Sequence, residues 1–83
     1  MSSVDKLVRR LLARPADMRF DEVETVLESF GYELKGSKGS HRRFERPGRP
    51  MIVVPVSARR VSRYYLADLV RLLGLEDTPY EED

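Results

Sequence analysis

The hydrophobic residues in the first part of the chain recur with the period of an α-helix. Spacings of i, i+3 and i+4 gather apolar side chains on one helical face. Ser2 and Asp5 are placed like a capping box before the first such stretch, and Pro15 requires that helix to end. Residues 13–19 then form a short connection. The apolar face of this first predicted helix consists of Val4, Leu7, Val8, Leu11 and Leu12.

A second predicted helix follows the connection and can lie against the first. Asp21 can cap it with its carboxylate while Glu24 returns a hydrogen bond. Gly31 fits the C′ position, because glycine readily adopts the left-handed conformation that ends many helices. The apolar face of this helix consists of Val23, Val26, Leu27 and Phe30.

Beyond Gly31 the hydrophobic period changes to two, which is typical of half-buried strands. Turn-forming residues gather at 36–39 and at 46–50, and predict two turns. The segment 51–56 is mostly β-branched and continuous rather than alternating, which favours a central or well-covered strand with Pro55 at its end. The predicted strands form a three-stranded meander made of residues 32–35, 40–45 and 51–56.

A final helix is predicted between Ser62, placed as its N-cap, and Gly74. The last five elements then have the order αβββα. We expect an α+β fold in which a three-stranded antiparallel sheet has helices on one face, plus an extra N-terminal helix. The other face of such a sheet is commonly open to water. The apolar face of the final helix consists of Tyr65, Leu66, Leu69, Val70, Leu72 and Leu73.

A chain of 83 residues suffices for one small domain, which we assign to residues 1–75. Cysteine is absent and one histidine is present, so neither a disulfide framework nor a usual set of metal ligands is available. No stretch approaches the ~18 consecutive apolar residues of a membrane span, and the N-terminus lacks the layout of a signal peptide. We expect a cytoplasmic protein that uses no metal, cofactor or membrane.

The net charge of +1 conceals a strong segregation of charge. Residues 35–63 carry nine basic side chains and a single acidic one, Glu45. Such a segment indicates an anionic partner such as nucleic acid, with a solvated basic surface as the alternative. Residues 76–83 carry five acidic side chains and no basic one, and we expect them to form a mobile tail.

The Gly39-Ser40-His41 sequence opens the basic middle strand and carries the candidate chemistry. With a period of two, Phe44 faces the core and His41 projects from the opposite side of the strand. An imidazole, whose ordinary pKa is near ~6.5, can donate or accept a proton near neutral pH. RNA cleavage through the 2′-hydroxyl requires such proton transfers, together with cations that neutralise the phosphate. The nearest cations in the sequence are Lys38, Arg42 and Arg43.

Each of these signals also has a plainer explanation. His41 can be an ordinary surface residue of a strand. The glycines of residues 36–39 permit close approach of a phosphate, but a tight hairpin turn explains them equally well. This turn lacks the Gly-Lys-Ser/Thr ending of a Walker loop, so we do not expect nucleotide binding.

Taken together, these residues resemble the HicA toxins of HicAB toxin–antitoxin pairs, over most of the chain. The resemblance implies a fold like that of double-stranded-RNA-binding domains. It also implies a small endoribonuclease, an mRNA interferase, that cleaves messenger RNA and is held inactive by a HicB-like antitoxin. The features that carry the resemblance are Phe30-Gly31-Tyr32, the run 36–44 with Gly-Ser-His, the valine-rich strand ending at Pro55, and the closing helix with Tyr64 and Tyr65.

The resemblance further implies that His41 is the catalytic histidine. Many relatives have a second histidine after the proline of the third strand, whereas Pro55-Val56 is followed here by Ser57. Paired histidines within one subunit are therefore excluded, and water, the 2′-hydroxyl, Lys38 or an arginine completes the proton and charge handling. The leading hypothesis is a metal-independent endoribonuclease. The residues expected to bind RNA are Lys35, Lys38, Gly39, Ser40, Arg42 and Arg43.

Two alternatives belong to other functional classes. A non-catalytic RNA-binding module would keep the fold but bind RNA without cleaving it. A protein-interaction domain would use its basic face only to meet an acidic partner, and would have no affinity for RNA.

Overall fold

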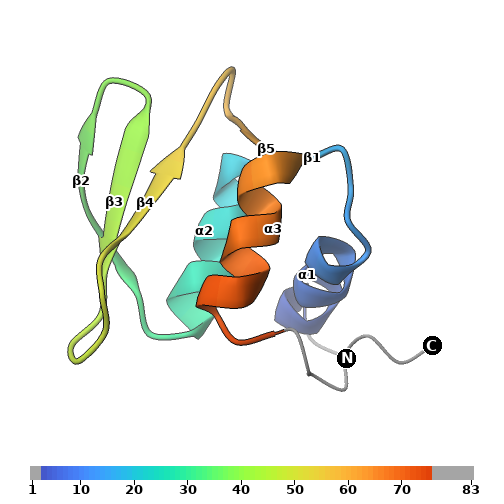
Figure 1. Ribbon diagram of the computed structural model, residues 1–83, viewed down its shortest axis with the longest axis horizontal. Helices are drawn as coiled ribbons and strands as arrows, with labels where there is room; N and C mark the ends of the chain where they lie inside the picture. The colour runs from blue at the N-terminus through green and yellow to red at the C-terminus, as the bar shows by residue number, and fades with distance from the viewer. Residues whose placement is uncertain (1–2, 76–83) are drawn as a thin grey trace.

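The computed structural model describes residues 3–75, which fold into three helices and two antiparallel sheets (Figure 1). The helices are α1 (Ser3–Leu12), α2 (Phe20–Ser29) and α3 (Arg63–Leu72). The larger sheet has the order β2-β3-β4 and consists of β2 (Glu33–Lys38), β3 (His41–Glu45) and β4 (Ile52–Pro55). The smaller sheet pairs β1 (Asp17–Arg19) with β5 (Arg60–Ser62). The α+β fold with the αβββα order and an extra N-terminal helix is confirmed.

Two expectations fall on residues that the structure does not describe. Residues 76–83, for which a mobile acidic tail is predicted, lie outside the described range, as does Ser2 of the predicted capping box.

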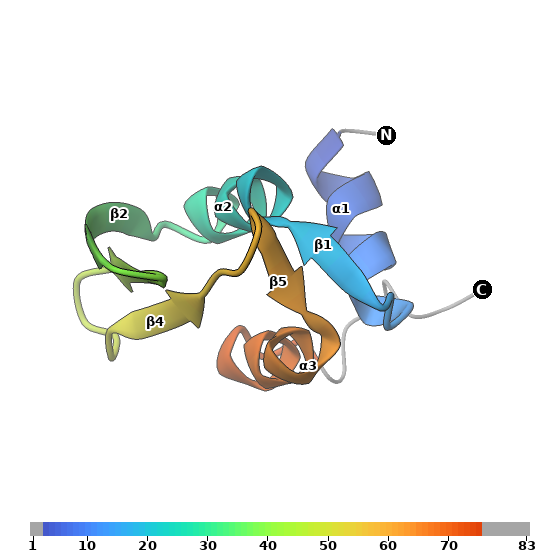
Figure 2. The same ribbon diagram turned by 90° about the horizontal axis from the view of Figure 1, so that it is seen from above.

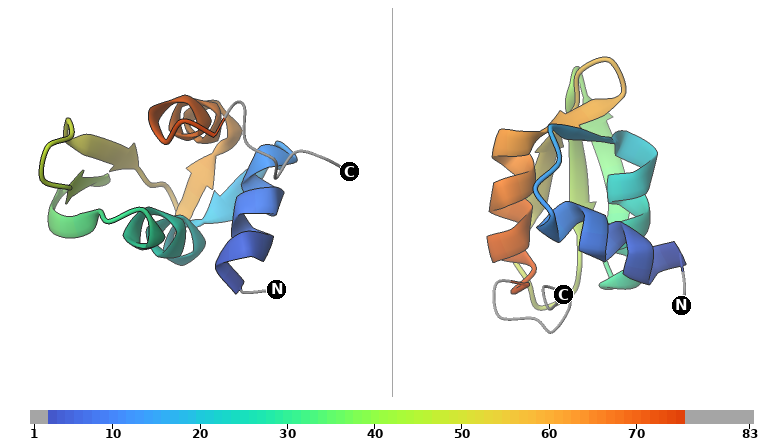
Figure 3. Two further views of the ribbon diagram at one scale, coloured as in Figure 1. Left: turned by 90° about the horizontal axis from the view of Figure 1, so that it is seen from below. Right: turned by 90° about the vertical axis from the view of Figure 1, so that its right-hand side faces the viewer.

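Helices α2 and α3 lie side by side against one face of the three-stranded sheet (Figures 1 and 2). Helix α1 runs across α2 and α3 on the side remote from that sheet (Figure 3). None of the described helices is long and apolar enough to cross a membrane. The core between these layers includes Phe44 and Val54 from the sheet, Leu27 and Leu69 from the helices, and the cross-strand pair Met18 and Val61.

Two glycines end helices as the sequence predicts. At Gly31, with φ of 91°, the amide of Tyr32 donates to the carbonyl of Leu27, and the amide of Gly31 donates to that of Glu28. The same pair of hydrogen bonds recurs around Gly74, with φ of 68°. This is the Schellman arrangement, which needs a residue in the left-handed conformation.

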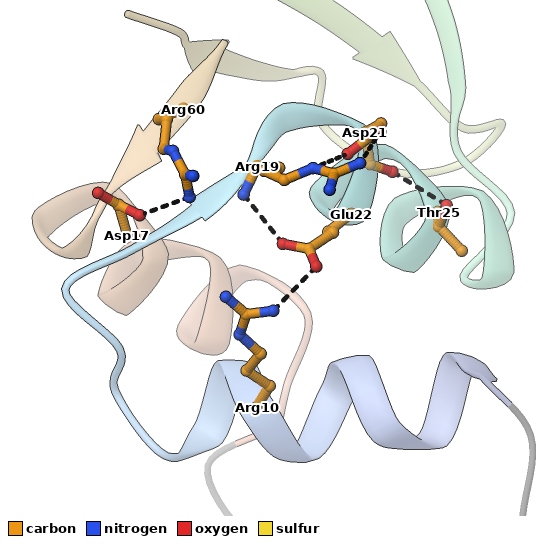
Figure 4. Close-up of polar contacts among 7 residues, drawn as sticks. All are labelled: Arg10, Asp17, Arg19, Asp21, Glu22, Thr25 and Arg60. Atoms are coloured by element: carbon orange, nitrogen blue, oxygen red, sulfur yellow. Dashed lines mark hydrogen bonds and ion pairs between the residues drawn. The ribbon is translucent and has the colours of Figure 1, made fainter. Parts of the chain in front are cut away.

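The start of α2 differs from the prediction. The helix begins at Phe20, and the Oε1 atom of Glu22, rather than Glu24, accepts a hydrogen bond from the backbone N–H of Arg19 at 3.0 Å (Figure 4). Asp21 does not cap the helix, because its carboxylate is bound by the guanidinium of Arg19 at 2.8 and 3.2 Å. The physical reason is that Arg19 is still part of β1, so the chain passes from strand to helix without a loop.

The β1–β5 pair is a second difference. Residues 13–19 are predicted to be only a connection, and no strand is predicted between the strand at 51–56 and the helix that follows Ser62. Met18 and Val61 face each other across this pair and are both fully buried, while Arg60 and Asp17 form an ion pair at 3.0 Å (Figure 4). Three residues are too short to display a period of two, so the sequence pattern did not reveal either strand.

In the larger sheet, two predictions about the strands are wrong. Strand β2 continues through the expected turn to Lys38, with a bulge between Leu34 and Gly36, so only Gly39 and Ser40 form the turn. Strand β4 is an edge strand rather than a central one, and its burial alternates. The central strand is β3, because both of its edges are paired.

A core substitution tests this arrangement of faces. Phe44→Ala removes a fully buried ring, and we expect it to lower the free energy of unfolding by about 3–5 kcal/mol. Val53→Ala, on the open face of the neighbouring strand, should lower it by about 1 kcal/mol or less. Urea denaturation followed by circular dichroism measures both, and equal losses would contradict the assignment of faces.

Candidate functional site

The open face of the three-stranded sheet brings Lys38, His41 and Arg43 together. Strand pairing places Lys38 directly opposite His41, and His41 opposite Pro55. Side chains directly opposite on neighbouring strands have Cβ atoms about 4.5–5.5 Å apart. These side chains border a shallow depression of about 370 Å³, which we call the His41 depression, and its lining residues are Gly36, Ser37, Lys38, His41, Arg43 and Val53.

The imidazole of His41 and the ammonium group of Lys38 have no partner among the described residues. Both side chains are exposed, and neither makes a hydrogen bond or an ion pair there. None of the described residues that line the His41 depression is acidic. Because neither group is bound to another side chain there, both can contact a phosphodiester: the imidazole can transfer a proton, and the ammonium group can neutralise negative charge.

Arg43, by contrast, is held in place. Its Nε atom donates to the carboxylate of Glu45 at 3.2 Å, and its Nη2 atom donates to the carbonyl of Lys35 at 3.4 Å. The guanidinium lies over Gly36, where an added Cβ would come within 3.3 Å of it. Gly36 therefore lies inside a strand, where it allows the guanidinium of Arg43 to approach the backbone closely, and not in the turn that the sequence predicted.

Lys35 lies beside the bulge of β2 and does not line the His41 depression. Its ammonium group pairs with Glu33 at 3.0 Å. The hydrogen bond and the charge of Glu33 raise the pKa of Lys35 above its ordinary value. The positive charge of this side chain is thus partly balanced within the same strand.

Gly39 and Ser40 form the two-residue turn between Lys38 and His41. Gly39 has φ of 58°, and no atom lies within 4 Å of the position that a Cβ would occupy. The backbone carbonyl of Ser40 accepts a hydrogen bond from Val56 at 2.7 Å, which ties the turn to the end of β4. The turn therefore presents an uncovered stretch of backbone beside His41.

Arg42 lies on the other side of β3 from His41 and Arg43. It points to the helical side of β3, where its guanidinium lies 5.8 Å from the centre of the Phe20 ring. Its Nη1 atom donates to the carbonyl of Gly39 at 2.8 Å. Neighbouring residues of a strand face opposite sides, so His41 and Arg42 cannot contact a phosphate from the same side.

The sequence-based prediction missed Gly36, Ser37 and Val53 as lining residues of the His41 depression. The signal for Gly36 was a glycine opposite an arginine on the neighbouring strand, but this is visible only once the register is known. Within residues 3–75, no three or more His, Asp or Glu side chains gather as a metal site would require.

Comparison with models of known protein families gives a match. The model of the family described as the HicA toxin of bacterial toxin-antitoxin matches residues 20–75, which is more than half of the chain. The matched region begins at the first residue of α2 and leaves out α1 and β1. No curated protein and no solved structure matches the chain significantly.

Two glycines of the site should respond differently to the same substitution. Gly39→Ala places a side chain on a residue with φ of 58°, and should lower the free energy of unfolding by ~1–2 kcal/mol. Gly36→Ala only pushes the flexible end of Arg43 aside in a strand, so its effect should stay within ~1 kcal/mol in either direction. Thermal denaturation compares the two variants, and a larger loss for Gly36→Ala would contradict these roles.

Proposed function

The chain belongs to the HicA toxin family of bacterial toxin–antitoxin systems, and we propose that it is an endoribonuclease that cleaves messenger RNA with His41 as its only catalytic imidazole. The observation that carries this proposal is the His41 depression. There an exposed imidazole without a partner among residues 3–75 stands directly opposite Lys38, on a face whose described lining has no acidic side chain.

In the proposed reaction the RNA supplies its own nucleophile. The 2′-hydroxyl attacks the adjacent phosphorus, the bond to the 5′-oxygen breaks, and the products are a 2′,3′-cyclic phosphate and a 5′-hydroxyl. One proton leaves the 2′-oxygen and one is delivered to the 5′-oxygen. His41 transfers one of these protons, and water transfers the other because the chain has no second histidine.

The cations of the open face have the complementary role. Lys38 and Arg43 neutralise the charge that grows on the non-bridging phosphate oxygens. Arg43 is already oriented by Glu45, whereas Lys38 is unpaired among the described residues, so Lys38 can move toward the phosphate as charge develops. The proposed mechanism uses side chains, water and the substrate, and needs no metal or cofactor.

The proposed partner is a HicB-like antitoxin that covers the open face of the sheet and so denies RNA access to His41. The proposed place of action is the cytoplasm, where messenger RNA is translated. The single histidine also favours a second candidate, a non-catalytic module that binds RNA without cleaving it.

Removing the imidazole tests the catalytic proposal. Because a positioned acid or base contributes about 10²–10⁴-fold, we expect His41→Ala to lower the single-turnover rate of cleavage of a long RNA by that factor. Its affinity for RNA and its circular dichroism spectrum should be retained, and expression of the variant should not arrest growth. Adding the cognate antitoxin to the unsubstituted protein should suppress cleavage.

Arg49→Ala is the matched control, since Arg49 is an exposed residue of the turn between β3 and β4, at the opposite end of the sheet from His41. It should cleave RNA at the rate of the unsubstituted protein. Equal cleavage by His41→Ala would rule out catalysis by the imidazole. An unsubstituted protein that binds RNA and leaves it intact would instead establish the non-catalytic module.

A further inference from the structure

A second depression lies on the other side of β3 from His41. It has a volume of about 660 Å³ and lies between the start of α2 and the turn that leads into β5. This turn and the Gly39–Ser40 turn lie at the same end of the molecule (Figure 1), where Val56 donates its amide hydrogen to the carbonyl of Ser40. We call it the Arg59 depression, and its charged lining residues are Arg19, Asp21, Arg42, Arg59 and Arg60.

Two of these four arginines are balanced by acidic side chains. Arg19 binds Asp21, and this hydrogen bond holds the pKa of Asp21 below its ordinary value, so the carboxylate stays charged beside its partner. Arg60 pairs with Asp17 across the β1–β5 sheet (Figure 4). These four side chains therefore contribute little net charge to the depression.

The other two arginines have no acidic partner among residues 3–75. Arg42 is fixed by the Phe20 ring and by the carbonyl of Gly39, neither of which neutralises its charge. Arg59 is exposed, and its guanidinium has no hydrogen-bond or ion-pair partner in the described part of the chain. Two uncompensated guanidinium groups that line one depression suit an anion with several oxygen atoms, such as a phosphate.

The backbone at Arg59 is unusual. Ser57 and Arg60 exchange two backbone hydrogen bonds, of 2.9 and 2.8 Å, around a two-residue turn whose central residues, Ala58 and Arg59, have φ of 52° and 64°. Turns with two left-handed residues ordinarily contain Asn, Asp or Gly. A left-handed conformation costs other residues about 1–2 kcal/mol each. The chain thus keeps an arginine at a position where the backbone favours glycine, which points to a use for its side chain.

We propose that Arg42 and Arg59 bind a phosphate of the RNA strand that flanks the phosphodiester cleaved at His41. The RNA would pass from the open face of the sheet over the Gly39–Ser40 turn to the helical side. Gly39 leaves this path uncovered, since no atom lies within 4 Å of its absent Cβ. This inference rests on the proposed function, because it concerns the same substrate.

The test is the salt dependence of RNA affinity. Each phosphate contact on a single strand contributes about 0.7 to the slope of log K against log salt concentration. All proteins in this test carry His41→Ala so that the RNA stays intact. The probe is a labelled single-stranded RNA of about twelve nucleotides, which is long enough to include the phosphates that flank the cleaved phosphodiester. We expect Arg59→Gln to reduce the slope measurably, by at most ~0.7 because Arg42 still faces the same phosphate, and to weaken binding several-fold; Arg59→Lys should restore the slope, because lysine keeps the charge.

Arg9→Gln is the matched control, since it removes one exposed arginine of α1 outside both depressions. Its slope should equal that of the His41→Ala protein. Arg42→Gln provides a second probe, with circular dichroism to confirm its fold.

The outcomes separate this inference from the proposed function. If the His41→Ala protein binds RNA and the unsubstituted protein cleaves it, but Arg59→Gln and Arg9→Gln give the same slope, the second phosphate site is wrong and the nuclease stands. If Arg59→Gln weakens only the binding of the antitoxin, the Arg59 depression is a protein interface and the inference is overturned. If neither the unsubstituted protein nor any variant binds RNA, the second phosphate site and the proposed function are both wrong.

Discussion

The burial of Phe44 is the constraint on which the functional surface depends. Its ring is fully buried and lies 6.1 Å from that of Phe20, centre to centre. A shift of one residue in the pairing of β3 would turn every side chain of the strand to the opposite face. By fixing Phe44 in the core, the fold therefore also fixes His41 on the open face and Arg42 beneath the helices. A purely apolar contact thus determines where the proton-transfer group and the cations of the molecule lie.

The acidic residues near the sheet form ion pairs with some of its cations and leave other cations without an acidic partner. Glu33 and Glu45 pair with Lys35 and Arg43, and exposed pairs of this sort contribute only about 0–1 kcal/mol to stability. Their effect is mainly on position, because they hold two cations in place and leave others unmatched. Among the cations without an acidic partner in residues 3–75, Lys38 stands beside His41, and Arg42 and Arg59 stand beyond the turn, whereas Arg46 and Arg49 lie at the other end of the sheet. The end with Lys38, Arg42 and Arg59 is distinguished by the single histidine that stands among these unmatched cations.

The sequence predicted the long elements and the side of β3 on which His41 lies, because apolar periodicity and glycine at helix ends are local signals. It did not predict the β1–β5 pair, since Met18 and Val61 become neighbours only after the chain has folded back. It placed Gly36 in a turn because a glycine opposite an arginine looks like any other glycine until the register is known. It grouped Arg42 with His41 as a nearby cation, although the alternation of faces already separated them. Long-range pairing, rather than local preference, accounts for each of these differences.

The β1–β5 pair also has a consequence for the order of folding. The His41 depression arises largely within one hairpin of residues close in sequence, whereas Asp17 and Arg60 meet across 43 positions. Closing so long a loop costs conformational entropy before any contact compensates for it, and contacts of this kind form slowly. We therefore expect the β2–β3 hairpin to form early and β1–β5 to dock last. During synthesis, the strand that bears His41 leaves the ribosome well before the segment that completes the core.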